Sequence, residues 1–157
     1  MAIARIVTGA DQEVLCTKAP KVTSFGKDLK RLIEDLMDTV VHEEGAGLAA
    51  VQIGVPLSVC VARIGGIFIP LINPEIIWSS DSAKEGEEGC LSLPKVWLYI
   101  PRNTEIIVRY LDEKGKEQER KLAGWDARVV QHEVDHLNGK LIVDYNAESA
   151  GEKGEAL

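Results

Sequence analysis

Two of the three histidines in this chain, His132 and His136, lie four residues apart, and Glu133 directly follows the first. On a helix, residues i and i+4 lie one above the other, so both imidazoles can bind one metal ion. Glu133 is turned by about 100° around the helix axis, from where its carboxylate can reach a water molecule beside that metal. This arrangement is typical of metal-assisted hydrolysis, in which the metal acidifies a water molecule and the carboxylate handles its proton.

The residues around the two histidines predict a short, partly buried helix. Apolar residues spaced by four, three and four positions run beside the histidines, at Val130, Val134, Leu137 and Leu141. Asp126 is a candidate N-cap, and Asn138-Gly139 favours a left-handed end to the helix. Because a buried histidine pair without a partner is costly, this setting favours a metal site.

A catalytic metal site needs a third protein ligand, and two classes of metalloproteases suggest where to look. In one class a glycine after the second histidine precedes a third histidine; here Gly139 fits, but the last position is Ile142, which cannot bind a metal. In the other class the ligand is a glutamate on a later helix. The glutamates near the end of this chain lie in a segment rich in Gly and Ala, at positions 148, 152 and 155. Neither protease pattern therefore supplies the third ligand.

The three cysteines differ in their surroundings. Cys60 lies in an apolar, strand-like run and is typical of a small core residue, and the same interpretation holds for Cys16. Cys90 instead follows Gly89 and two glutamates, and acidic neighbours disfavour a free thiolate unless a cation offsets their charge. A bound metal would supply that cation.

Three segments resemble the signature motifs of the peptide deformylase family. They are Gly45-Ala46-Gly47-Leu48-Ala49-Ala50-Val51-Gln52, Glu88-Gly89-Cys90-Leu91-Ser92 and Gln131-His132-Glu133-Val134-Asp135-His136-Leu137. Their order and spacing match as well, and the likeness extends from about Val14 to Tyr145. The resemblance implies that the protein removes the N-terminal formyl group from the formyl-methionine of newly made polypeptides.

The resemblance also implies a role for individual residues. The metal ligands are Cys90, His132 and His136, and the general acid/base is Glu133. Gln52, together with the backbone N–H of Leu91, polarises the formyl oxygen. These roles agree with the chemistry, because three protein ligands leave a fourth position open, and fixed donors aimed at a developing oxyanion contribute ~10²–10³ in rate.

Candidate substrate-binding residues follow from the same resemblance, namely Ala46, Gly47, Glu88, Trp97, Trp125 and Val129. The backbone around Gly47 is expected to pair with the peptide as a strand does, and Trp125, Val129 and Leu91 to line an apolar methionine pocket. Two positions depart from the family pattern. Ala46 replaces a bulkier aliphatic residue, and Trp97 stands where some members carry an arginine.

One divalent transition metal is the expected cofactor. A thiolate and two imidazoles suit Fe(II) or Zn(II). We expect Fe(II) in the cell, with Zn(II) or Ni(II) as alternatives in the purified protein. Two other functions stay open. One is a non-catalytic module that binds formyl peptides or metal, which the presence of Glu133 and Gln52 argues against; the other is a general metallopeptidase, which the cysteine ligand disfavours.

Composition sets the broader expectations. A net charge of −7 gives no electrostatic basis for nucleic-acid or acidic-membrane binding, and three widely spaced cysteines indicate a reducing compartment. The N-terminus lacks the long apolar run of a signal peptide. We therefore expect a cytoplasmic monomer that acts on formyl-methionyl nascent peptides, has at most a weak ribosome contact, and binds neither nucleic acid directly nor a membrane.

The pattern of apolar residues predicts a single α+β domain over residues 1–157. Short, mainly antiparallel strands are expected at 59–64, 67–72, 96–100, 104–111, 116–122 and 141–144. They pack around the central metal-binding helix, and one amphipathic N-terminal helix ends near Gly45. Residues 146–157 are acidic and Gly-rich, so we expect them to be disordered, and deletion of residues 151–157 to leave activity on short formyl peptides unchanged.

Overall fold

The computed structural model describes residues 2–145 and 156–157. Its helices are α1 (Glu13–Cys16), α2 (Lys27–His42) and α3 (Gly124–Leu137), with two short 3₁₀ turns, η1 (Ala50–Ile53) and η2 (Ile142–Asp144). Its strands are β1 (Gly47–Ala49), β2 (Val59–Ile64), β3 (Ile67–Ser79), β4 (Ala83–Cys90), β5 (Leu93–Asn103), β6 (Glu105–Leu111) and β7 (Glu117–Ala123). Five strands form an antiparallel sheet in the order β1-β2-β3-β6-β7, and β4 pairs with β5 as a separate antiparallel hairpin.

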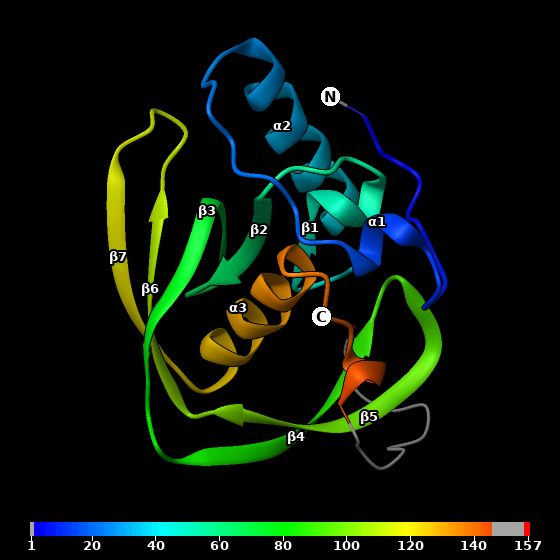
Figure 1. Cartoon of the computed structure of the whole chain (residues 1–157), viewed down its shortest axis with the longest axis vertical. Helices are drawn as coiled ribbons and strands as arrows, with labels where there is room; N and C mark the ends of the chain where they lie inside the picture. Colours follow the sequence, from blue (N-terminus) through cyan, green and yellow to red (C-terminus); the bar gives the residue numbers. More distant parts are fainter. Residues whose placement is uncertain (1, 146–155) are drawn as a thin grey trace.

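Helix α3 lies at the centre of the molecule, with the five-stranded sheet on one side and the β4–β5 hairpin on another (Figure 1). It contacts β1, β2, β3, β6 and β7 of the sheet and β5 of the hairpin. Since most of its residues are buried, the polar side chains on α3 must find partners inside the protein. This central helix confirms the expected α+β architecture.

The two ends of α3 differ in how well the sequence predicts them. Asp126 is not the N-cap as expected, because the helix begins at Gly124 after Ala123. Asp126 lies in the first turn instead, where its carboxylate accepts the backbone N–H of Gly65 at 3.1 Å. The C-terminal prediction is confirmed, since Asn138 caps the helix and Gly139 has a φ of 76°.

Helix α2 is the amphipathic helix expected before Gly45. Its buried face is apolar and consists mainly of Leu29, Leu32, Ile33, Leu36 and Val40. These side chains belong to a cluster that also contains Leu48 of β1 and Val59 of β2. The helix therefore covers the β1 end of the sheet and fixes the position of β1.

Several strands differ from the prediction. β3 continues to Ser79, with register shifts against β6. β4 was not expected at all, because its sequence is charged and Gly-rich rather than alternating, and its strand conformation depends on pairing with β5. The prediction of a strand at 141–144 is wrong. These residues form the turn η2, in which the Asp144 carboxylate accepts the backbone N–H of Leu141 at 2.8 Å.

The expected disorder of residues 146–157 concerns mostly residues outside the described ones, since 146–155 are not described. For Ala156 and Leu157 the structure differs from that expectation. Ala156 forms a parallel bridge with Gly89, and the Leu157 side chain is buried. Within the described residues, no helix is both long and apolar enough to cross a membrane.

Candidate metal centre and active site

Cys90, His132 and His136, which we call the metal triad, meet in the interior of the protein. Their ligand atoms lie within 4.8 Å of one another. The Nε2 atoms of the two histidines are 3.0 Å apart, and Nε2 of His136 is 3.3 Å from Sγ of Cys90. Ligand atoms around a tetrahedral ion lie roughly 3.3–3.6 Å apart. Two of the three separations in the triad are close to this range, so these residues could hold one metal ion.

Local structure explains how distant residues converge here. The helical spacing stacks the two imidazoles of α3, with ring centroids 4.7 Å apart. Cys90 is the last residue of β4, and a register shift between Gly89 and Cys90 interrupts the pairing with β5. Such an irregularity re-aims a side chain.

The anionic groups around the triad favour a positive charge at the site. Burial alone would lower the pKa of His132, but its hydrogen bonds with Cys90 and with the accepting carboxylate of Glu88, together with the charge of Glu133, raise it to about 10. Burial and the neighbouring His132 lower the pKa of His136 well below its usual value. A metal ion can replace the proton on His132 as the cation of the site, since metals displace protons from their ligands.

Glu88 holds His132 in position. Its Oε1 lies 3.0 Å from Nδ1 of His132, which leaves Nε2 facing the other triad atoms. Arg102 donates to both Glu88 oxygens at 2.8 Å, and Arg128 donates to Oε2 at 2.6 Å. Burial would raise the pKa of Glu88, but the hydrogen bonds and charges of Arg102 and His132 lower it to about 2. Glu88 is therefore an ionised anchor.

This position does not support the expected side-chain contact between Glu88 and substrate. The side chain is 0% exposed, and both oxygens are taken by protein groups. The two arginines were missed from the sequence, because nothing in their local pattern separates Arg102 in a strand or Arg128 on a helix from solvated residues. Arg102 also donates to Asp135 at 2.6 Å, and this ion pair links β5 directly to α3.

Glu133 faces the triad region without a partner. Both carboxylate oxygens are buried and have no hydrogen-bond partner in the described part of the chain. A Cβ built on Gly47 would lie 2.7 Å from Glu133 Oε2, so the carboxylate contacts the backbone of β1. Burial raises the pKa of Glu133 to about 7, against the lowering effect of His132. A carboxyl group of this kind suits a general base near neutral pH.

Gln52 is held with its amide nitrogen toward Cys90. Its Oε1 accepts the backbone N–H of Ala49 at 3.0 Å, while Nε2 donates to Ser92 Oγ at 3.1 Å and lies 3.7 Å from Cys90 Sγ. The side chain is fully buried. Leu91 follows Cys90, and its side chain packs beneath Gly45, where a Cβ would lie 3.0 Å away. The predicted oxyanion donors thus lie beside the triad.

The predicted substrate residues do not all lie at one place. Ala46 precedes β1 and Gly47 is its first residue. Trp97 packs over Gly89, where a Cβ would lie 2.5 Å from the indole ring. Val129, three residues before His132 on α3, is fully buried in the core. Trp125 is 40% exposed and lines a separate hollow of about 270 Å³ with Gly86 and other residues. The structure therefore does not bring Trp125 together with Ala46 and Trp97.

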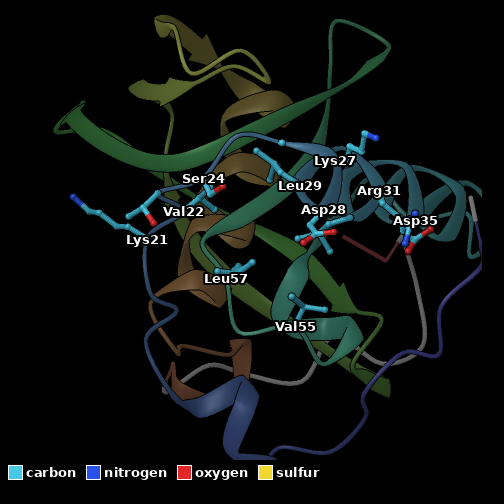
Figure 2. Close-up of a pocket in the computed structure, with 13 residues that line it drawn as sticks. Lys21, Val22, Ser24, Lys27, Asp28, Leu29, Arg31, Asp35, Val55 and Leu57 are labelled. Carbon is cyan, nitrogen blue, oxygen red and sulfur yellow. The ribbon is translucent and has the colours of Figure 1, made fainter.

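A surface pocket of about 560 Å³ lies elsewhere on the molecule (Figure 2). Figure 2 shows Lys21, Val22 and Ser24 on one side of it, and Leu29 and Asp35 of α2 on another. None of the triad residues lines it. The chemistry described above therefore does not depend on this pocket.

Comparison with known proteins gives a consistent result. Residues 3–151 match the sequence profile of the family described as polypeptide deformylase. The chain is 44% identical over 131 residues to peptide deformylase of Thermotoga neapolitana, covering 83% of this chain and 80% of that protein. It is 42% identical to peptide deformylase 1 of Rickettsia conorii, covering 92% of this chain and 88% of that protein.

Solved structures agree with the sequence relatives. The crystal structure of peptide deformylase from Thermotoga maritima superposes with a TM-score of 0.88 at 41% identity, covering 92% of this chain and 97% of that one. The Met-Ala-Ser-bound class I type b peptide deformylase from Acinetobacter baumannii gives a TM-score of 0.86 at 29% identity, covering 91% and 98% of the two chains.

Proposed function

This chain belongs to the polypeptide deformylase family, and on that basis we propose which of its residues hydrolyse the formyl group of N-terminal formyl-methionine. The reaction breaks one amide bond. Water adds to the formyl carbon, the C–N bond breaks, and formate and a free α-amine are released. The chain must therefore orient the formyl group, take a proton from water and deliver a proton to the departing nitrogen.

Cys90, His132 and His136 would hold one divalent transition metal, which supplies a Lewis acid and lowers the pKa of water. Their burial and mutual distances support this assignment. Glu88 fixes the ring of His132 through Nδ1. We take Fe(II) as the ion in the cell and Zn(II) or Ni(II) as ions that the purified protein can carry, because one thiolate and two imidazoles accommodate each of them.

Glu133 would take the proton from the attacking water and pass it to the leaving nitrogen. Its carboxylate is buried and has no hydrogen-bond partner among residues 2–145 and 156–157, and its pKa of about 7 matches a group that both accepts and returns a proton. This unpartnered carboxylate beside Gly47 and the triad is the single observation that carries the proposal, since a structural glutamate in such a place would destabilise the fold without benefit.

Gln52 and Leu91 would stabilise the oxygen of the formyl group as it gains charge. The Gln52 carbonyl is fixed by the N–H of Ala49, which leaves its Nε2 on the side of Ser92 and Cys90. The backbone N–H of Leu91 belongs to the residue next to Cys90. Donors that are positioned before the charge develops meet the condition for oxyanion stabilisation, and the hydrogen bonds of Gln52 position its amide in this way.

The peptide would lie along Ala46 and Gly47, between β1 and β4, with Trp97 near its later residues. Gly47 lacks a side chain that would push Glu133 away. Trp125 is a weaker candidate than the sequence suggested, because it lines a different hollow. We further propose that the protein acts as a cytoplasmic monomer on nascent chains, with at most a weak contact to the ribosome.

A formate-release assay tests the proposal. Metal-loaded protein is incubated with formyl-Met-Ala-Ser, and separately with Met-Ala-Ser. We expect formate and intact Met-Ala-Ser from the first peptide, and no cleavage of the second. Hydrolysis of the Met–Ala bond would instead indicate a general metallopeptidase, and binding without formate release would indicate a non-catalytic module.

A further inference from the structure

Two strand edges face each other beside the metal triad. β1 is the last strand at one end of the five-stranded sheet, and β4 belongs to the separate hairpin. Edge strands present unpaired backbone N–H and C=O groups that can pair with a further extended segment. The space between Ala46, which precedes β1, and Gly89 of β4 is therefore suited to a peptide in strand conformation.

Ala156 and Leu157 of the same chain lie in this space. Ala156 forms a parallel bridge with Gly89, and the Leu157 N–H donates to the Gly89 carbonyl at 3.0 Å. On the opposite side, the Ala46 N–H donates to the Ala156 carbonyl at 3.4 Å. The segment 156–157 thus uses backbone groups from both walls.

The side chains of this segment are placed unequally. Leu157 is 0% exposed and belongs to the same buried apolar cluster as Cys90, Val129 and Val130. Ala156 instead lines an open hollow of about 660 Å³, together with Trp97. One side chain is therefore buried in the apolar cluster that includes Cys90, and the other lies at an open hollow. This distribution is expected for an extended peptide bound in the groove.

We propose that the segment 156–157 occupies the peptide groove of its own chain and competes with substrate. The inference rests on the proposed function, because it takes the groove beside the triad as the substrate site. A formyl peptide can bind only when the segment is displaced, so the apparent affinity falls by the fraction of molecules with an open groove. The chemistry after binding is unchanged.

This inference reverses the expectation drawn from the acidic, Gly-rich sequence, which predicted no effect of deleting residues 151–157 on short substrates. Deletion of residues 156 and 157 alone should lower KM for formyl-Met-Ala-Ser by about threefold or more, with kcat unchanged, if the groove is occupied at least two-thirds of the time. Leu157→Asp should act like the deletion, because burial of an unpaired carboxylate is unfavourable. Leu157→Met should keep the KM of the unaltered chain.

Ile67→Asp is the matched control, since it makes the same change of residue type and charge at a side chain that is 68% exposed. Its KM should equal that of the unaltered protein.

The blocked peptide acetyl-Glu-Ala-Leu should inhibit the deletion variant competitively, and acetyl-Glu-Ala-Asp should not. Equal KM values for the deletion variant and the full chain would overturn the inference while leaving deformylation intact. A KM that rises with protein concentration would also overturn it, because the occupant would then come from another copy.

A second measurement does not depend on activity. The Leu157 amide should exchange with solvent at least about threefold more slowly than in a free peptide, because it donates to the Gly89 carbonyl in a buried site and exchanges only in the open fraction. Addition of Met-Ala-Ser should remove this protection, and Leu157→Asp should lack it. If no variant releases formate, the proposed function fails. Unprotected exchange of the Leu157 amide in the full chain would overturn the occupancy of the groove separately.

Discussion

At the scale of single residues, the site depends on side chains that have few substitutes. Glu133 lies against the backbone of Gly47 and has no hydrogen-bond partner within the part of the chain that the structure describes. Cys90 is the one triad ligand that does not come from α3. Each of these residues has a counterpart elsewhere in the chain with the same chemistry and a different setting. Comparison of such pairs separates the role of the position from that of the residue type.

Cys90→Ser should weaken metal binding or change which metal is bound, because a serine hydroxyl resists deprotonation and is a harder ligand than a thiolate. Metal content per chain, measured by mass spectrometry after gel filtration, checks this. Cys16→Ser is the control, since Cys16 lies outside the triad and is exposed, which corrects its sequence-based interpretation as a core residue. Loss of metal from Cys16→Ser but not from Cys90→Ser would contradict the ligand assignment.

Gly47→Ala should reduce kcat/KM by about 10²-fold with metal retained, because the added methyl group displaces the Glu133 carboxylate from its position. Steady-state kinetics on formyl-Met-Ala-Ser give the value. Gly26→Ala should have no such effect, since a Cβ there meets nothing within 4 Å. Equal activities of the two variants would show that Glu133 tolerates the shift.

At the scale of elements, the site is assembled by α3 and β4, and the Glu88 cluster holds them together. Glu88 of β4 binds Arg102 of β5 and both Arg128 and His132 of α3. A buried carboxylate paired with two arginines is costly to disrupt, because removal of one partner leaves buried charge uncompensated. The cluster therefore determines both the orientation of His132 and the packing of the hairpin against α3.

Glu88→Gln should lower metal affinity by about 10–100-fold, the usual effect of removing a partner that orients a histidine ligand. The variant should also unfold at a lower temperature, because Arg102 and Arg128 lose their shared counter-charge. Chelator competition and thermal unfolding measure the two effects. Glu85→Gln on the same strand is the control, since Glu85 is exposed. Unchanged metal affinity of Glu88→Gln would remove its positioning role.

The elements also show what sequence alone can and cannot predict. The spacing of apolar residues predicts α2 and α3 because a helix buries one face wherever it packs. It misses β4, whose charged and Gly-rich residues become a strand through pairing with β5. The triad can be predicted because only a few residue types, such as Cys and His, bind a transition metal. Glu88 was assigned to substrate, and its arginine partners were missed, because their pairing arises only when three elements meet.

At the scale of the whole molecule, we expect metal binding and folding to be coupled. The triad joins the last residue of β4 to two positions on the central helix. A ligand that binds only the folded state stabilises it in proportion to its affinity and concentration. Removal of the metal should therefore loosen the contact between hairpin and helix as well as stop catalysis.

Dialysis against a chelator should lower the midpoint of thermal unfolding, and re-addition of Zn(II) or Ni(II) should restore it. At a free metal concentration of 100 Kd the expected stabilisation is about 2.7 kcal/mol. Scanning calorimetry at matched protein concentration gives the shift. In Cys90→Ser the shift should be much smaller. An unfolding midpoint that does not respond to the metal would contradict the coupling between the triad and the fold.

The most direct measurement compares formate release from formyl-Met-Ala-Ser by the unaltered protein and by Glu133→Ala, at equal metal content. We expect both proteins to carry one metal ion per chain and the variant to turn over ~10²–10⁴ times more slowly, because a positioned proton-transfer group is lost. Glu113→Ala, at an exposed turn, should keep full activity. Unaltered turnover by metal-loaded Glu133→Ala would contradict the proposed mechanism.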